Sequence, residues 1–142
     1  MDIGKLPSQT PNRIYAGTGM GGVVILNPST GKLEGVVSMR LGGVFAIPPD
    51  GHEIYVSETH WTHGNRGDRQ DMLAVYDGVN LTLKREIALP GRLIAGGRRP
   101  YFNLSADGRR GYVFNLQPAT SVIAVDMVRG RVLSEIETPG CG

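Results

Sequence analysis

Short apolar runs, separated by turn-forming residues, recur along the whole chain. Residues 23–27, 73–77 and 121–126 are three of these runs, and each ends in Asn or Asp. Runs of this length, bounded by Gly, Pro, Asn and Asp, are typical of buried strands. No long segment has apolar residues at helical spacing. The pattern therefore predicts an all-β fold.

The runs belong to a longer repeat. Asn27 and Asp77 are 50 positions apart, and Asp77 and Asp126 are 49 positions apart. Each of these side chains suits the start of a turn, because it can accept a hydrogen bond from the backbone two residues later. Four strands per unit of roughly 40–50 residues are typical of a β-propeller blade. The sequence thus predicts about two to three four-stranded blades.

The predicted blades follow a polar leader or linker. We expect the fourth strand of the first blade at residues 44–47 and that of the second blade at 101–104. A propeller needs at least about four blades to close, so we expect the chain to be a fragment of a longer protein. A small open sandwich of two or three sheets is the alternative. The predicted boundaries are 1–12 for the leader and about 13–51, 52–108 and 109–142 for the blades.

One stretch, residues 58–77, interrupts the repeat. It contains the only Trp and two of the three His. We expect its first half to be a polar, Gly-rich loop and its second half to be a strand. A loop of this composition is expected to contact a partner subunit. The candidate interface residues are His60, Trp61, His63, Arg66 and Arg69.

The same stretch gathers possible metal ligands. His60, His63, Asp68 and Asp71 lie within 12 residues, and imidazole and carboxylate groups suit divalent ions. Their spacing is not a recognised zinc arrangement, and no Cys or third His lies near them. A solvated or interface loop is therefore favoured over a metal site, and no metal ligand is predicted.

No catalytic machinery is evident in the sequence. The Gly-rich segment 17–22 precedes an apolar strand instead of the helix that a dinucleotide-binding loop requires. No serine lies in the Gly-x-Ser-x-Gly motif of a nucleophile elbow. Glu53 and Glu58 could pair with distant residues, but the sequence does not show which. We predict no catalytic or cofactor-binding residue.

Composition agrees with many short strands joined by tight turns, since the 142 residues include 21 Gly and 9 Pro. The formal net charge of +2 is too small to indicate a nucleic-acid partner. No run of 18 apolar residues is present, so no membrane-spanning helix is predicted. Arg provides 12 of the 15 basic residues, which suits packed interfaces but would also result from GC-rich coding.

Several segments together resemble a known family. Residues 64–77, followed by 81–90, are similar to the heavy (β) subunit of bacterial amine dehydrogenases that use tryptophan tryptophylquinone. Residues 116–126 and the closing Pro139-Gly-Cys141 fit the same family, which includes the methylamine and aromatic-amine dehydrogenases. The Arg-Gly-x-Arg-x-Asp segment and the Pro-Ala-Thr-Ser run are the more specific parts, and the resemblance covers nearly the whole chain.

The resemblance implies a seven-bladed propeller in the periplasm, of which this chain would form the first two to three blades. The family's complex oxidises a primary amine to an aldehyde and ammonia and passes the electrons to a blue copper protein, azurin or amicyanin. A small light subunit carries the quinone and the catalytic base. This chain would scaffold that subunit and help to shape the substrate channel, without a cofactor of its own, in a heterotetramer of two heavy and two light subunits.

Two further residues take roles from the resemblance alone. Met20 lies in the first-blade loop, where the family lines the substrate channel with a bulky apolar residue. Cys141 resembles the first half of the family's heavy-subunit disulfide, whose partner would lie beyond Gly142. Two alternatives remain open. One is a periplasmic repeat propeller that binds a protein or small ligand without redox chemistry, and the other is a lactonase-like hydrolase with a metal held by inward carboxylates.

Overall fold

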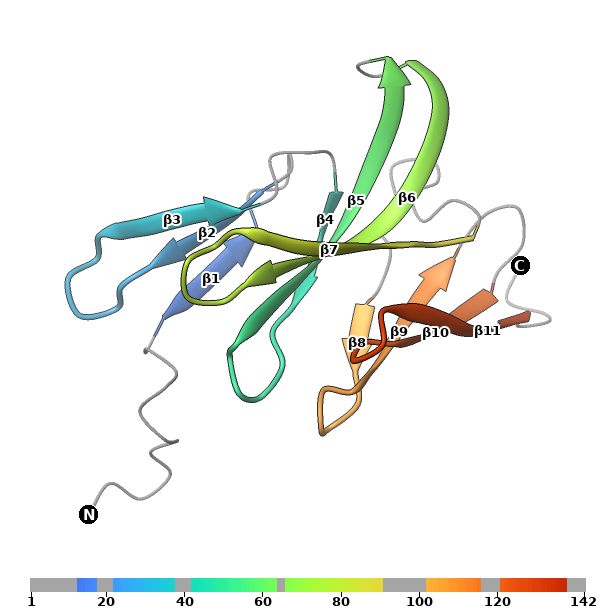
Figure 1. Ribbon diagram of the computed structural model, residues 1–142. Coiled ribbons are helices and arrows are strands. Elements are labelled where there is room, and N and C mark those ends of the chain that lie inside the picture. The colour runs from blue at the N-terminus through green and yellow to red at the C-terminus, as the bar shows by residue number, and fades with distance from the viewer. Residues whose placement is uncertain are drawn as a thin grey trace.

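Three antiparallel sheets make up the computed structural model, which describes residues 13–17, 22–37, 42–63, 66–90, 102–115 and 121–137 (Figure 1). Sheet 1 contains β1 (Ile14–Gly17), β2 (Val23–Leu26) and β3 (Leu33–Val37). Sheet 2 contains β4 (Gly42–Ala46), β5 (Glu53–His63), β6 (Arg66–Asp77) and β7 (Leu83–Ala88). Sheet 3 contains β8 (Phe102–Leu104), β9 (Arg110–Asn115), β10 (Ser121–Asp126) and β11 (Arg131–Glu137).

The prediction of an all-β fold is confirmed. In each sheet, strands that follow one another in the chain lie side by side and run antiparallel. The described residues contain no helix of the length and hydropathy that a membrane span requires.

The sheets and the sequence repeat are out of phase by one strand. Residues 44–47 were expected to end the first unit, but β4 pairs with β5 and so begins sheet 2. Likewise, β8 pairs with β9 and begins sheet 3 instead of ending the second unit. The reason is local, because the N–H of Gly51 donates to the carbonyl of Pro48 and turns the chain straight back alongside β4. A repeat period measures the spacing of strands, not the strand with which a sheet begins.

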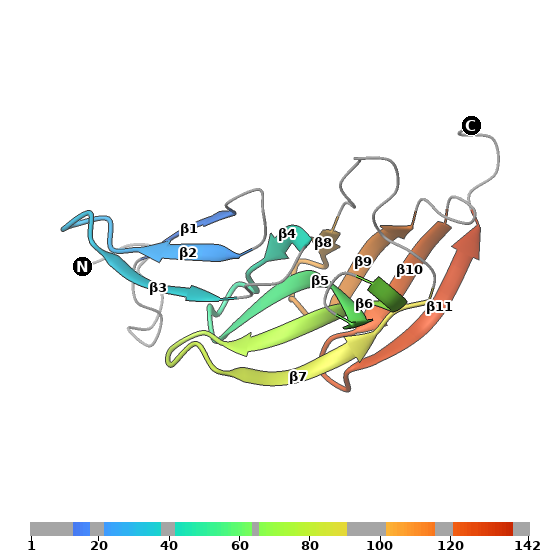
Figure 2. The ribbon, with the colours of Figure 1, turned by 90° about the horizontal axis from the view of Figure 1, so that it is seen from above.

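The three sheets lie one after another, and apolar side chains fill the space between neighbours (Figure 2). Successive residues of a strand point to opposite faces, so β5 directs Ile54 and Val56 toward sheet 1 and Tyr55 toward sheet 3. Sheet 2 is therefore covered on both faces, which explains why the run 73–75 is apolar without alternation. The core between sheets 2 and 3 is the larger of the two and includes Leu73, Val75, Ile87, Leu89, Phe102, Val113, Ile123, Val125 and Met127.

Each sheet contains the same kind of turn, which joins β2 to β3 in sheet 1, β6 to β7 in sheet 2 and β10 to β11 in sheet 3. The Oδ1 atoms of Asn27, Asp77 and Asp126 each accept two backbone N–H groups, from the residues two and three positions later. The prediction that these residues initiate turns is confirmed. The hydrogen bonds from the backbone favour the ionised carboxylates, so they hold the pKa values of Asp77 and Asp126 below the ordinary value.

The fifth position of these turns differs in sheet 2. Gly31 and Gly130 occupy it in sheets 1 and 3 with φ angles of 70° and 72°, a region that suits glycine. Leu81 occupies it in sheet 2 with a φ of 64°, and no other described non-glycine residue has a positive φ. The Leu81 side chain packs against the core between sheets 1 and 2 and reaches over Gly35, where a side chain would collide with it.

Arginine side chains tie each sheet to the turn of the next. Arg13 donates to the carbonyl of Gly78, and Arg85 Nη2 donates to the carbonyl of Met127 at 2.8 Å. Gly78 and Met127 are equivalent residues, each directly after the Asp that initiates its turn. These two contacts agree with the interpretation that arginine serves packed interfaces in this chain.

Candidate functional site

A long hairpin replaces the expected loop in the stretch 58–77. β5 and β6 pair from Glu53 and Asp77 as far as His63 and Arg66, so residues 58–63 and 66–71 belong to strands. The prediction of a Gly-rich loop was wrong. Ladder hydrogen bonds join backbone groups, so a hairpin that has already formed can continue through polar residues that show no apolar alternation. The outer part of this hairpin projects beyond the rest of the sheets at the top of Figure 1.

A buried carboxylate lies where the projecting part of this hairpin begins, on the face of sheet 2 that carries Ile54 and Val56. The side chain of Glu58 is only 1% exposed. Its Oε1 accepts the hydroxyl of Tyr76 at 2.5 Å, and its Oε2 lies 2.9 Å from Nε2 of His60. The same Nε2 atom is 3.8 Å from Oε1 of Glu86, which reaches across from β7. Glu58 and His60 are two residues apart on one strand, so both point to the same face.

The opposite face of the hairpin carries a buried ion pair. The side chain of Asp71 is fully buried, and Arg69 grips it with two hydrogen bonds, from Nε at 2.8 Å and from Nη2 at 2.9 Å. Two parallel bonds of this kind are the strong, directional form of an arginine–carboxylate contact. Gln70 Nε2 adds bonds to the carbonyls of Asp71 and Leu89, which ties the hairpin to the end of β7. Arg69 therefore stabilises the hairpin itself.

The predicted interface residues do not share one environment. His60 belongs to the Glu58 cluster, and Arg69 to the ion pair with Asp71. His63 is exposed and pairs in register with Arg66 near the tip of the hairpin. The side chains of Trp61 and Arg66 lie outside what the structure describes, as do the whole residues Met20 and Cys141. The interface role of the hairpin stays a prediction.

The possible metal ligands considered from sequence do not come together. His60 and Asp71 lie on opposite faces of the hairpin, because Asp71 is paired with Thr59, the residue next to His60. Within the described ranges, the single group of three possible ligands is Glu58, His60 and Glu86. The strand period would have linked Glu58 to His60, had the segment been recognised as a strand. Nothing in the sequence indicates that Glu86 joins them.

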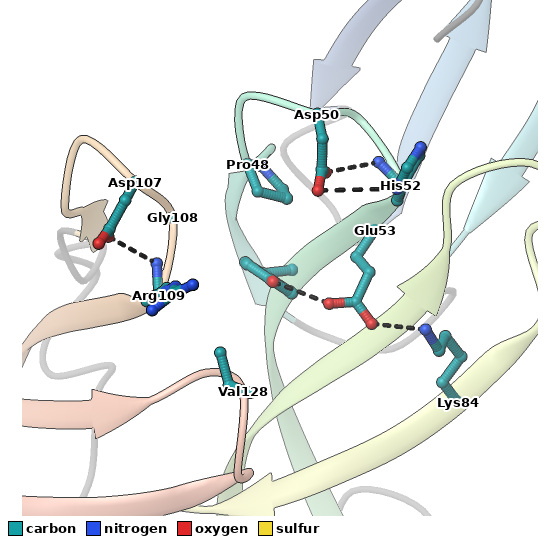
Figure 3. Close-up of a pocket in the computed structure, with 10 residues that line it drawn as sticks. Pro48, Asp50, His52, Glu53, Lys84, Asp107, Gly108, Arg109 and Val128 are labelled. Atoms are coloured by element: carbon teal, nitrogen blue, oxygen red, sulfur yellow. Dashed lines mark hydrogen bonds and ion pairs between the residues drawn. The ribbon is translucent and has the colours of Figure 1, made fainter. Parts of the chain in front are cut away.

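A second polar region lies at the opposite end of sheet 2, where the tight turns of sheets 2 and 3 meet. Its pocket has a volume of about 360 Å³, and Figure 3 shows carboxylates and cations around it. Glu53 is held there by Lys84 Nζ at 2.6 Å, by Arg85 Nη1 at 3.3 Å and by the hydroxyl of Tyr55 at 2.9 Å. The partners of Glu53 that the sequence could not name are thus residues of β5 and β7.

The environment of Glu53 keeps it ionised. Burial opposes ionisation, but the hydrogen bonds from Lys84 and Tyr55 and the charge of Arg85 outweigh it and hold the pKa of Glu53 below its ordinary value. Burial, together with the neighbouring Glu53 carboxylate, raises the pKa of Tyr55, so its hydroxyl remains a hydrogen-bond donor. Charges of both signs line this pocket, which suits a structural junction between two sheets.

Comparison with known proteins decides the family. The model of the family described as "Methylamine dehydrogenase heavy chain (MADH)" matches residues 15–142. The chain belongs to the methylamine dehydrogenase heavy chain family. The resemblance noted in the sequence is therefore confirmed over nearly its whole length. A comparison with curated proteins found no match.

Solved structures support the fold. The hydrazine synthase of Kuenenia stuttgartiensis is similar with a TM-score of 0.64 and 18% identity, over 100% of this chain and 40% of that one. The dihydro-heme d1 dehydrogenase NirN, in complex with DHE, is similar with a TM-score of 0.65 and 19% identity, over 98% of this chain and 28% of that one. The chain thus spans less than half of either protein. At these identities the likeness concerns the fold alone, and the prediction of a partial β-propeller is confirmed.

Proposed function

We propose that the chain works as part of the heavy subunit of an amine dehydrogenase complex, which oxidises primary amines to aldehyde and ammonia. The observation that carries the proposal is the family match over residues 15–142. The partial propeller fold supports it, because it is the architecture expected of that subunit. In this proposal the chain provides a scaffold, and the chemistry takes place on another subunit.

The proposed partner is a small light subunit that carries tryptophan tryptophylquinone and the catalytic base. We infer a periplasmic heterotetramer of two heavy and two light subunits, which passes electrons to azurin or amicyanin. Met20 is proposed to help shape the substrate channel, and Cys141 to form a disulfide. The hairpin of β5 and β6 supports a scaffold role, because its internal ion pair and hydrogen bonds suit a rigid surface for docking.

The proposed heavy subunit continues the propeller past sheet 3. Sheet 3 exposes Tyr112 and Ile136 on the face that points away from sheet 2. The equivalent residues of sheet 2, Tyr55 and Ile87, are buried against sheet 3. A further sheet packed on sheet 3 would bury Tyr112 and Ile136 in the same manner.

Affinity purification of the full-length protein from its native host tests the proposal. We expect a small, Cys-rich subunit with two cross-linked Trp residues to co-purify, and the complex to reduce an artificial electron acceptor when a primary amine is added. The gene for that subunit should lie in a neighbouring reading frame. A protein that purifies without such a subunit, and shows no amine-dependent activity, would instead favour the non-catalytic repeat propeller.

The hairpin contact needs a separate test. Replacing Arg66 and Arg69 together with Ala would not test the contact cleanly, because Arg69 also holds Asp71 in place. The cleaner variant is His63→Ala combined with Arg66→Ala, near the tip of the hairpin. Arg129→Ala is the matched control, since Arg129 is exposed in the turn between β10 and β11 of sheet 3. Equal recovery of the light subunit with the double variant, the control and the wild type would contradict the interface role.

A further inference from the structure

The cluster of Glu58, His60 and Glu86, where the projecting part of the hairpin begins, combines three side chains of types that commonly bind metals. One nitrogen of His60 and one oxygen each of Glu58 and Glu86 lie within 4.8 Å of one another. Glu58 and His60 are largely buried, with side-chain exposures of 1% and 15%, while Glu86 is partly exposed. One side of the cluster is therefore closed by protein, and Glu86 lies at its more open side.

The spacing of these atoms fits a single cation. Zinc binds His nitrogen and carboxylate oxygen at about 2.0–2.2 Å, so neighbouring ligands around one ion lie roughly 3.0–3.5 Å apart. The distances from His60 Nε2 to the Glu58 and Glu86 oxygens, 2.9 Å and 3.8 Å, bracket this range. The three atoms are thus close enough to share one ion once their side chains turn toward it.

We propose that Glu58, His60 and Glu86 form a binding site for a first-row divalent metal ion such as Zn²⁺. One imidazole and two carboxylates suit borderline ions, and the set has no thiolate that would favour a softer metal. Three protein ligands leave at least one coordination position for water, at the side where Glu86 is exposed. All three ligands belong to this chain, whereas the quinone is proposed for the light subunit.

The surroundings of the cluster support a built site. Glu58 and His60 are both held on β5, and β6 lies between them and Glu86 on β7. Ala74 is the residue of β6 that is paired with Glu86, and Met72 is the one paired with Glu58, so the side chain of Glu86 crosses β6 obliquely to reach the cluster. The Tyr76 hydroxyl bonds the second oxygen of Glu58 and so orients the carboxylate. Outer hydrogen bonds of this kind typically position metal ligands.

A bound ion would link the outer strand β7 to β5 across β6. It would also neutralise the negative charge of two carboxylates that lie close together, one of them buried. Because an ion that binds only the folded state stabilises it, zinc should raise the melting temperature of the protein. The link lies directly beneath the projecting part of the hairpin and would fix its base.

Zinc titration of the full-length protein, in the complex with which it purifies, tests this proposal. The protein is first treated with a chelator and then dialysed, and zinc binding is followed by calorimetry and by elemental analysis. His60→Ala and Glu86→Gln each remove a ligand. His52→Ala is the matched control, because it removes an exposed imidazole at the other end of sheet 2. Using the difference between variants cancels any metal bound by the partner subunit.

We expect the wild type and His52→Ala to bind one more zinc ion per chain than His60→Ala. Glu86→Gln should weaken that site at least about tenfold, as disturbed metal shells commonly do. Zinc should raise the melting temperature of the wild type and of His52→Ala, but not that of His60→Ala. Equal stoichiometry and affinity in the wild type and both ligand variants would overturn the proposal, as would a wild type that binds no zinc. If His60→Ala does not fold, Glu86→Gln decides the matter, since the partly exposed Glu86 tolerates an amide.

Discussion

The two central strands of sheet 2 and those of sheet 3 pair in the same register over six positions, and only those of sheet 2 are paired further. In both sheets the two central strands pair over six positions, starting at Asp77 in sheet 2 and at Asp126 in sheet 3, where the chain turns into the next strand. In sheet 3 this pairing stops at the other end, at Asn115 and Ser121, whereas in sheet 2 it continues past Glu58 and Met72 for five further residues of β5. The shared pairs join 53–58 with 72–77 in sheet 2 and 110–115 with 121–126 in sheet 3.

The two parts of the sheet 2 hairpin have different contents. The shared part is mainly apolar and packs against both neighbouring sheets. Polar clusters begin where that part ends, with Glu58 and His60 on one face and Arg69 and Asp71 on the other. The comparison separates a repeated scaffold, which sets the fold, from a single extension that carries most of the unusual polar chemistry. The predictions below test where that boundary lies.

Equivalent residues on the far faces of the two sheets give the largest expected effect. Ile87 is 2% exposed and Ile136 is 59% exposed. If a further sheet covers sheet 3 in the full-length protein, Ile136→Ala should cost about 2–5 kcal/mol in the free energy of unfolding, as expected for the buried Ile87→Ala. Val79→Ala, in an exposed turn, should stay within about 0.5 kcal/mol. Urea unfolding measures all three. A cost for Ile136→Ala as small as that for Val79→Ala would show that the face is not covered.

The ion pair on the extension gives the next largest effect. Arg69→Ala leaves the fully buried carboxylate of Asp71 without its guanidinium partner. Breaking a buried pair from one side typically costs about 3 kcal/mol or more, so we expect a loss of about 3 kcal/mol in the free energy of unfolding. Arg129→Ala, in an exposed turn, is the control and should change it by less than about 0.5 kcal/mol. Similar denaturant midpoints for the two variants would mean that the extension contributes little to the fold.

The sequence was sufficient to predict the features that depend on near neighbours. The strands and the turns at Asn27, Asp77 and Asp126 follow from local pattern and side-chain chemistry. The phase of the sheets could not be predicted in this way, since a period does not mark where a sheet begins. The family resemblance depended on segments such as 64–77. Their amino-acid sequence is specific to the family, although part of this segment was predicted to be a loop and forms a strand.

The candidate site was harder to predict for a physical reason. Residues 58–63 and 66–71 lack the apolar alternation that marks a strand. They form strands only because they pair with one another. Without that register, the pairing of Glu58 with His60 and Tyr76, which lies 18 residues later, has no signal in the sequence. Glu86 adds a contact across a third strand. Contacts between distant segments required the structure.

Substitutions of Leu81 should have a smaller effect on stability, and glycine should be better tolerated there than alanine. Leu81→Gly loses the packing of a partly buried side chain, but it relieves a left-handed backbone that costs a non-glycine residue about 1–2 kcal/mol. Leu81→Ala loses the same packing and keeps the strain. We therefore expect Ala to destabilise the protein by about 1 kcal/mol more than Gly, although glycine is normally the poorer residue in regular structure. Thermal unfolding of both variants checks the order. A glycine variant less stable than the alanine variant would contradict it.

The smallest expected effect concerns the protonation of Asp77 and Asp126, which initiate the turns of sheets 2 and 3. Asp77 and Asp126 have pKa values below the ordinary 3.8, because backbone N–H groups from Asn80 and Arg129, among others, bond their carboxylates. A lowered folded-state pKa means that this stabilisation is present above pH 3.8 and is lost as the pH falls through the lower folded-state values. Asn27 closes the equivalent turn of sheet 1 with the same two hydrogen bonds and does not titrate.

The double variant Asp77→Asn, Asp126→Asn converts both turns to the sheet 1 form. At pH 7 its melting temperature should be close to that of the wild type, since an amide oxygen accepts the same backbone bonds. As the pH falls from above 3.8 through the lower folded-state pKa values, the wild type should lose more of its melting temperature than the variant, because only the wild type has carboxylates to protonate in these two turns. Because both carboxylates lie at the surface, where solvent screens their charges, the difference should be small and additive over the two turns. Identical pH profiles would show that the hydrogen bonds to Asp77 and Asp126 do not favour the ionised form, and that the three turns are equivalent in this respect.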